Sequence, residues 1–119
     1  MSANDVTWLA DVLRADGLTV VEYPGWTTRS ASGVCEPRAV MWHHDASAVG
    51  PSPNIARMIA EQGNSSTPAP LSQCWVDTTG RWHVLAAGRA NHAGTGRGWE
   101  VIPRDSGNRY SIGIETDHT

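Results

Sequence analysis

The sequence predicts an α/β fold with roughly five strands and two helices, in one domain that spans residues 1–119. Apolar residues near the N-terminus repeat at helical spacing. A continuous apolar run at 39–43 is typical of a buried central strand. The segment 77–80, Asp-Thr-Thr-Gly, separates two strand-like segments and indicates a hairpin with glycine in the left-handed position. A length of 119 residues suits a single core.

The N-terminal region predicts a helix and then a short strand. Asn4 or Asp5 is expected to cap the helix, and Gly17 is expected to end it. Its apolar positions at i, i+3, i+4 and i+7 are Val6, Leu9, Ala10 and Leu13. The β-branched segment 18–23 then predicts a strand, and the Ser-, Thr- and Gly-rich segment 27–37 a loop.

The middle of the chain predicts a central strand, a helix and a hairpin. The strand at 39–43 presents His43 at its end, and a second helix is expected from Pro51 to Gly63. Segments 71–76 and 82–86 are expected to pair as the hairpin. The glycine-rich segment 88–109 predicts a long functional loop, and 110–116 predicts the last strand.

Composition excludes several classes of protein. A net charge of −3 and a pI near 5.9 argue against nucleic-acid binding, which normally needs a basic stripe. The N-terminus lacks the basic and apolar regions of a secretory signal, and no apolar run is long enough to cross a membrane. We therefore expect a protein made in the cytoplasm without a signal peptide. Cys35 and Cys74 are expected to be unpaired, partly buried thiols.

Four histidines need separate interpretation. His43 and His44 are neighbours on a strand and point to opposite faces, so one could ligate a metal while the other lines a cleft. His92 lies among small residues that leave room for another molecule, or else it bonds backbone within its loop. His83 in the hairpin is expected at the surface.

Glu115 is the strongest candidate for chemistry. Ile112 and Ile114 place apolar side chains on one face of the last strand, which leaves Gly113 and Glu115 on the other. Burying a carboxylate in such a strand is costly unless it is paired or poised with a raised pKa. Carboxylates of this kind tend to be general bases or to orient a neighbouring group.

Three segments carry a resemblance to a known family. They are 42–47 (Trp-His-His-Asp-Ala-Ser), 88–94 (Gly-Arg-Ala-Asn-His-Ala-Gly) and 111–115 (Ser-Ile-Gly-Ile-Glu). In this order and spacing they resemble signature blocks of zinc-dependent N-acetylmuramoyl-L-alanine amidases, the type 2 amidase and peptidoglycan recognition protein family. The resemblance covers about 38–119. The sequence of 85–96 is most similar to that of endolysins from phages that infect actinobacteria. All positive side chains of the chain are Arg and none is Lys, which agrees with a GC-rich genome.

The resemblance implies a fold, a cofactor and roles for particular residues. The fold would be a central mixed β-sheet flanked by helices, and Zn²⁺ would be held by three protein ligands with an open fourth position. His43 would be the first zinc ligand and Glu115 the acid/base residue. Residues expected to contact the peptidoglycan substrate are His44, Gln73, Asn91, His92 and Gly94.

The sequence also departs from the family pattern. Many relatives have a Tyr-His pair where this chain has Ser72 and Gln73. The second and third zinc ligands of the family follow the strand of Glu115 and a further helix, so we expect an N-terminal portion of the domain that lacks the C-terminal helix. A partner polypeptide could complete it, or the chain could be an inactive fragment. The sheet face with Val40 and Ile112 or Ile114 should then lack cover, which favours self-association.

The expected activity is therefore zinc-assisted cleavage of the amide between N-acetylmuramic acid and L-alanine, acting at the bacterial cell wall during phage lysis. The alternative is a non-catalytic module that binds peptidoglycan in the same cleft. Neither of these two functions involves nucleic acid or insertion into a membrane.

Overall fold

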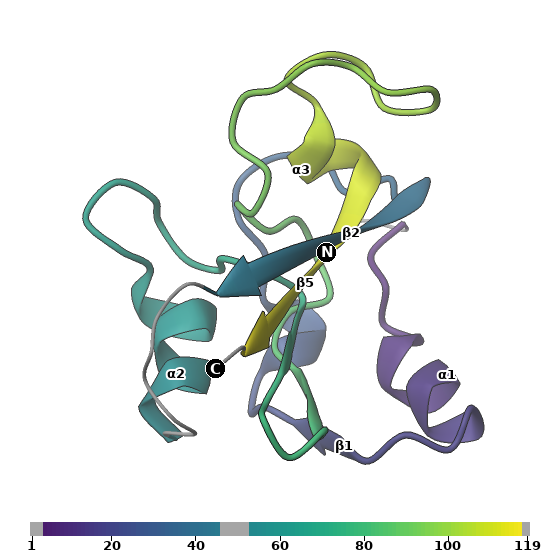
Figure 1. Cartoon of the computed structure of the whole chain (residues 1–119), viewed down its shortest axis with the longest axis vertical. Helices are drawn as coiled ribbons and strands as arrows, with labels where there is room; N and C mark the ends of the chain where they lie inside the picture. The colour runs from purple at the N-terminus through teal and green to yellow at the C-terminus, as the bar shows by residue number, and fades with distance from the viewer. Residues whose placement is uncertain (1–3, 46–52, 118–119) are drawn as a thin grey trace.

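A computed structural model describes residues 4–45 and 53–117, and within them five strands form one mixed sheet (Figure 1). The strands are β1 (Val20–Glu22), β2 (Ala39–Asp45), β3 (Cys74–Val76), β4 (Trp82–Val84) and β5 (Ser111–Asp117). Their order across the sheet is β1-β4-β3-β5-β2. Only the hairpin β3–β4 is antiparallel, and the other neighbours run parallel. The predicted α/β fold with a mixed sheet is confirmed.

Short helical elements precede and connect the strands. They are α1 (Leu9–Ala15), the 3₁₀ turn η1 (Trp26–Thr28), α2 (Pro53–Arg57), its π-helical continuation η2 (Met58–Gln62) and α3 (Gly107–Tyr110). Gly63 ends η2 with a positive φ of 70°, and a Cβ there would collide with the carbonyl of Thr67. The described residues contain no helix that is long and apolar enough to cross a membrane.

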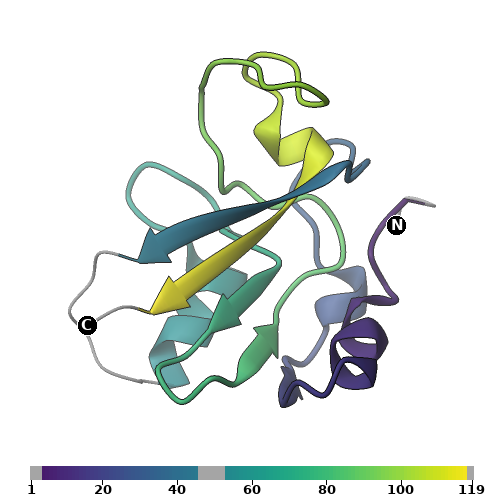
Figure 2. The same cartoon turned by 45° about the vertical axis from the view of Figure 1, so that its right-hand side comes forward.

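Helices α1 and α2 lie on opposite sides of the strands (Figures 1 and 2). Because side chains alternate along a strand, the sheet contributes to a separate core on each face. The core on the α1 side contains Val6, Leu9, Ala10, Trp26, Cys74, Val84, Ala87, Ile112 and Ile114. The core on the α2 side contains Ile55, Ala56, Ile59, Ala60, Trp75 and Leu85. We call these faces the α1 side and the α2 side.

Several expectations from the sequence are wrong in detail. Helix α1 begins at Leu9, after Trp8, and no side chain caps it, so neither Asn4 nor Asp5 is its cap. Ile112 and Ile114 are each only 6% exposed because they pack into the core on the α1 side, whereas Val40 on the edge strand β2 is 51% exposed. The expectation of an uncovered face therefore holds for Val40 and fails for the two isoleucines.

The hairpin differs from expectation at His83. Its imidazole is mostly buried: it stacks on Trp75 with ring centroids 4.4 Å apart, and its Nε2 lies 2.8 Å from a carboxylate oxygen of Asp77. Gly80 closes the turn with a φ of 86°, as predicted. His83 is thus part of the packing of the hairpin rather than a surface residue.

Candidate functional site

The pairing of β2 with β5 places two of the candidate residues side by side. His43 is the register partner of Glu115, and two residues earlier Met41 is the partner of Gly113. In a parallel pair the side chains of register partners lie on the same face of the sheet. The carboxylate and the imidazole therefore share the α2 side. Local sequence patterns predict both strands, but no local pattern predicts that they are neighbours.

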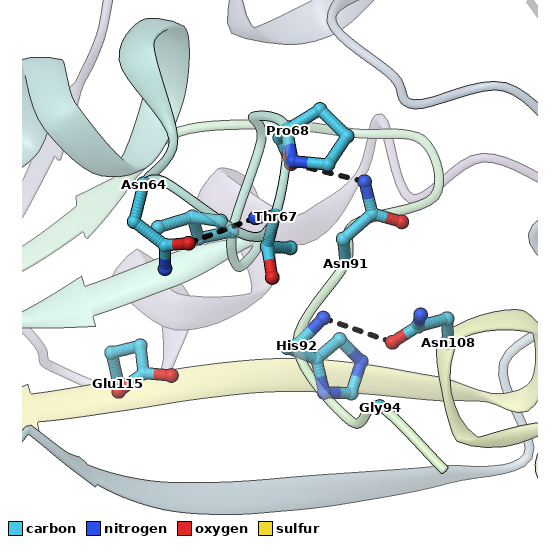
Figure 3. A pocket seen from close by; sticks show the side chains of 9 residues that line it. Asn64, Thr67, Pro68, Asn91, His92, Gly94, Asn108 and Glu115 are labelled. Carbon is cyan, nitrogen blue, oxygen red and sulfur yellow. Dashed lines mark hydrogen bonds between the residues drawn. The ribbon is translucent and has the colours of Figure 1, made fainter.

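The loop that carries His92 is held against this face from two directions. The side-chain oxygen of Asn108, in α3, accepts hydrogen bonds from the backbone N–H groups of His92 (2.9 Å) and Ala93 (2.7 Å). On the other side, Asn91 donates from its side chain to the Pro68 carbonyl (3.0 Å) and from its backbone to the Pro70 carbonyl (2.8 Å). The bonds to Asn108 and Pro68 are drawn in Figure 3. These hydrogen bonds fix the backbone on both sides of the His92 side chain and so position its ring.

Gly113 makes the room that the His92 ring occupies. A Cβ at this position would collide with the imidazole of His92. The ring thus lies directly over β5, where its Nδ1 is 2.9 Å from Nε2 of His43. Its own Nε2 lies 3.3 Å from the carbonyl oxygen and 3.4 Å from the hydroxyl of Ser111. Three groups from β2, β5 and the 88–109 loop are joined in this way.

Burial disfavours the charged form of both imidazoles. Burial lowers the pKa of His92 to about 4, and the nearby His43 contributes to the same shift. Burial also lowers the pKa of His43. A neutral imidazole carries one ring proton and one nitrogen lone pair, so each ring can donate one hydrogen bond and accept one.

A cavity of about 430 Å³ opens beside these groups. Its lining consists of Asn64, Thr67, Pro68, Leu71, Asn91, His92, Gly94, Asn108 and Glu115. Figure 3 shows the Glu115 side chain on β5 and the His92 ring along one side of the opening, with Asn64, Thr67 and Asn91 across from them. Such a volume lies in the range typical of small-ligand sites. The arrangement combines a carboxylate and an imidazole with neutral hydrogen-bonding groups.

Four of the residues expected at the site line this cavity: Asn91, His92, Gly94 and Glu115. His43 is linked to it through His92. Their roles toward a substrate stay predictions.

Two of the expected substrate contacts do not line this cavity. His44 is exposed on the face of β2 opposite His43. Gln73 is fully buried: its amide donates to the Gly88 carbonyl (2.9 Å) and accepts from the Gly113 N–H (2.7 Å). Because both ends of its amide are hydrogen-bonded inside the protein, Gln73 holds β5 and the loop at Gly88 together and does not face the cavity.

Sequence reasoning missed five lining residues: Asn64, Thr67, Pro68, Leu71 and Asn108. The polar composition of 63–70 indicated a loop, but only the hydrogen bonds of Asn91 to Pro68 and Pro70 bring that loop to the cavity. For Asn108 the only available signal was an asparagine close before the last strand.

The described residues do not form a zinc site. Zinc in proteins usually needs at least three protein ligands. Within 4–45 and 53–117 no group of three or more His, Cys, Asp or Glu side chains could hold a metal ion. Burial raises the pKa of Cys35 to about 11 and that of Cys74 to about 12, so both thiols are protonated. Among the described residues that face the site, only His43 has an imidazole nitrogen, Nδ1, that makes no hydrogen bond to another described residue.

Comparison with known proteins supports this picture at the level of the family. No curated protein and no solved structure matches the chain significantly. The family model Amidase_2, described as N-acetylmuramoyl-L-alanine amidase, matches residues 34–119. The match spans β2 to β5 and contains every residue that lines the cavity. The chain therefore belongs to the N-acetylmuramoyl-L-alanine amidase family.

Proposed function

We propose that this chain is the amidase domain of a phage endolysin, made in the cytoplasm of an actinobacterial host and active on the cell wall. Membership of the family implies a peptidoglycan amidase activity. The scissile bond would be the amide between the lactyl group of N-acetylmuramic acid and L-alanine. The observation that carries the proposal is that Glu115 and His92, from two of the three family-like segments, line one cavity within the family match.

The cavity suits an amide substrate flanked by sugar and peptide. Glu115 is the one carboxylate among the lining residues, and the proposed role is to take a proton from the attacking water and return it to the departing L-alanine amine. The amides of Asn64 and Asn91 and the hydroxyl of Thr67 offer hydrogen bonds to a neutral substrate.

Hydrolysis by this family is expected to depend on zinc, and one imidazole does not hold zinc tightly. The proposal therefore requires ligands from outside the described residues, supplied by the undescribed segments or by a partner polypeptide that completes the domain.

A second candidate is a module that binds peptidoglycan without cleaving it. The same lack of a three-ligand group within the described ranges favours this candidate. It would use the lining residues for binding alone.

The direct test measures which bond is broken in actinobacterial peptidoglycan. Amide cleavage releases the free amine of L-alanine, whereas cleavage of a glycosidic bond releases reducing ends. The assay is run on the chain alone and on the chain supplied with zinc, with elemental analysis of each dialysed sample. Free amines support the amidase; reducing ends contradict it. Sedimentation with peptidoglycan without any release of amines, in either sample, supports the binding module.

In the same samples we expect well under one zinc ion per chain after dialysis of the chain alone, because three ligands are normally needed. Stoichiometric zinc retained through a mild chelator would contradict this expectation and point to ligands within residues 1–119.

A further inference from the structure

We infer that His92 is a positioning residue for His43: it fixes the tautomer of the His43 ring, with the proton on Nε2 and the lone pair on Nδ1. This inference rests on the proposed function for the importance of His43. The hydrogen-bond chain on which it is argued is independent of that function.

The hydrogen bonds link His43 to His92 and His92 to Ser111, and their direction follows from the groups of Ser111. Nε2 of His92 lies 3.3 Å from the Ser111 carbonyl oxygen, which can only accept. The Ser111 hydroxyl donates to the Gly107 carbonyl, so its oxygen is also available as an acceptor at 3.4 Å. Both neighbours therefore require the proton of a neutral His92 to be on Nε2.

The other nitrogen of His92 is then unprotonated and has to accept. Its partner is Nε2 of His43 at 2.9 Å, a normal length for an N–H donor. His43 must supply that donor, so the single proton of its neutral ring is on Nε2. The remaining nitrogen, Nδ1 of His43, keeps its lone pair and makes no hydrogen bond to another described residue.

The surrounding structure holds this arrangement in place. Asn108 anchors the backbone of His92 and Ala93, and Gly113 leaves the space in which the His92 ring lies. The carbonyl of Ser111 belongs to β5, which pairs with the strand of His43. The orientation of the lone pair on Nδ1 is thus set by main-chain geometry. An imidazole that acts as a ligand or as a base needs such a partner on its other nitrogen.

Nuclear magnetic resonance on the metal-free full chain tests the inference without any assay of activity. With ¹⁵N in the histidine rings, at pH 7.5, long-range proton–nitrogen spectra identify which ring nitrogens carry protons. We expect both His43 and His92 to carry the proton on Nε2. We also expect a through-hydrogen-bond coupling between Nε2 of His43 and Nδ1 of His92. A proton on Nδ1 of either ring would overturn the inference.

Two variants sharpen the result. His92→Phe keeps a flat ring over Gly113 but has no acceptor, so the coupling should vanish and the Nε2 proton of His43 should exchange faster with water. Val40→Thr, an exposed position on the opposite face of the same strand, should leave the His43 signals unchanged. Should His92→Phe fail to fold, the spectra of the unmodified chain still decide the tautomers.

The role in turnover is measured separately, in whichever sample cleaves the amide. His92→Phe should lower kcat by about 10–100-fold, the usual cost of losing a group that orients a ligand or base, with little change in KM. An unchanged kcat would contradict the positioning role. Absence of amidase activity in every sample, together with the expected tautomers, would overturn the proposed function and leave the hydrogen-bond chain established.

Discussion

The two sides of strand β2 differ sharply. On the α2 side, His43 is half-buried and bonded to His92, beside the cavity that Glu115 lines. On the α1 side, Val40 and Trp42 are 51% and 60% exposed. A cavity of about 700 Å³ lies next to Val40, larger than the 430 Å³ at Glu115. Size alone would select the α1 side, whereas the α2 side is distinguished by the convergence of ring nitrogens and a carboxylate.

The carboxylates near the two cavities show the same contrast. Glu36 on the α1 side forms an ion pair with Arg109 at 2.6 Å and is partly exposed. Such pairs contribute little to stability. Glu115 instead lies half-buried on β5 beside its register partner His43, where a charged group is costly to bury unless it is paired or hydrogen-bonded.

The largest effect is expected from Glu115→Gln. The change keeps the size of the side chain and its hydrogen bonding but removes its capacity to take a proton, so the amidase rate should fall about 10²–10⁴-fold. The rate is measured by release of the L-alanine amine, and circular dichroism confirms the fold.

The matched control is Glu36→Gln, which removes a carboxylate at the other cavity and should leave the rate unchanged. If Glu115→Gln kept most of the activity, Glu115 would be structural, and the contrast between the two carboxylates would be lost.

Gly113→Ala should damage the α2 side more than the fold as a whole. The added methyl group would collide with the His92 ring, and overpacking of this kind typically costs about 1–3 kcal/mol. Urea denaturation measures the loss. Gly96→Ala provides the comparison, because a Cβ there meets no atom within 4 Å. Equal stability of the two variants would mean that the loop of His92 moves aside freely.

Asp77→Asn should weaken the hairpin that supports the α2 side. Asp77 accepts hydrogen bonds from Thr79, from the Arg81 backbone and from His83. Burial alone would raise its pKa, but the bonds from His83 and Thr79 hold the pKa of this carboxyl well below its usual value of 3.8. Loss of the charged acceptor should cost about 1–3 kcal/mol at pH 7.

The sign of the pH dependence follows from the lowered pKa of Asp77. Its contribution to the free energy of unfolding is fully present above pH 3.8 and decreases as the pH falls toward the lower pKa of the folded state. The difference between the original chain and Asp77→Asn should therefore shrink below about pH 4. Denaturation at pH 7 and pH 3 checks this, and a constant difference would count against a charge-based role.

The smallest effect is expected from Val40→Thr. An exposed substitution usually changes stability by no more than about 0.5 kcal/mol. Exposed apolar surface promotes association, so sedimentation at rising concentration should show less self-association for the variant. A purely monomeric original chain would show that the exposed α1 side of β2 does not drive association.

The strands and the family-like segments could be predicted from the sequence because they depend on local patterns. The apolar run at 39–43 and the alternation around Glu115 led to β2 and β5, and the turn at 77–80 led to the β3–β4 hairpin. Helix α1 was misplaced at its start because polar Asn4 and Asp5 mimic a cap, whereas the chain enters the helix only after Trp8.

The site was harder to predict because it depends on pairing between distant segments. The two faces of β2 follow from alternation, yet His44 was assigned to the cleft although it lies on the face opposite His43. Gln73 is expected at the substrate because it stands where many relatives have the second residue of a Tyr-His pair. Its burial between β5 and the loop at Gly88 depends on three-dimensional contacts that no spacing in the sequence reveals.

The two hydrogen bonds of Gln73 have a consequence for motion. One side chain ties the strand of Glu115, through the Gly113 N–H, to the start of the loop of His92, through the Gly88 carbonyl. Opening of this loop should break the hydrogen bond of Gln73 to Gly88 and so loosen the bond of the same side chain to Gly113 on β5. The two segments should therefore exchange their amide hydrogens as one cooperative unit. Substrate would then meet a cavity in which β5 and the loop of His92 are already coupled to each other before it arrives.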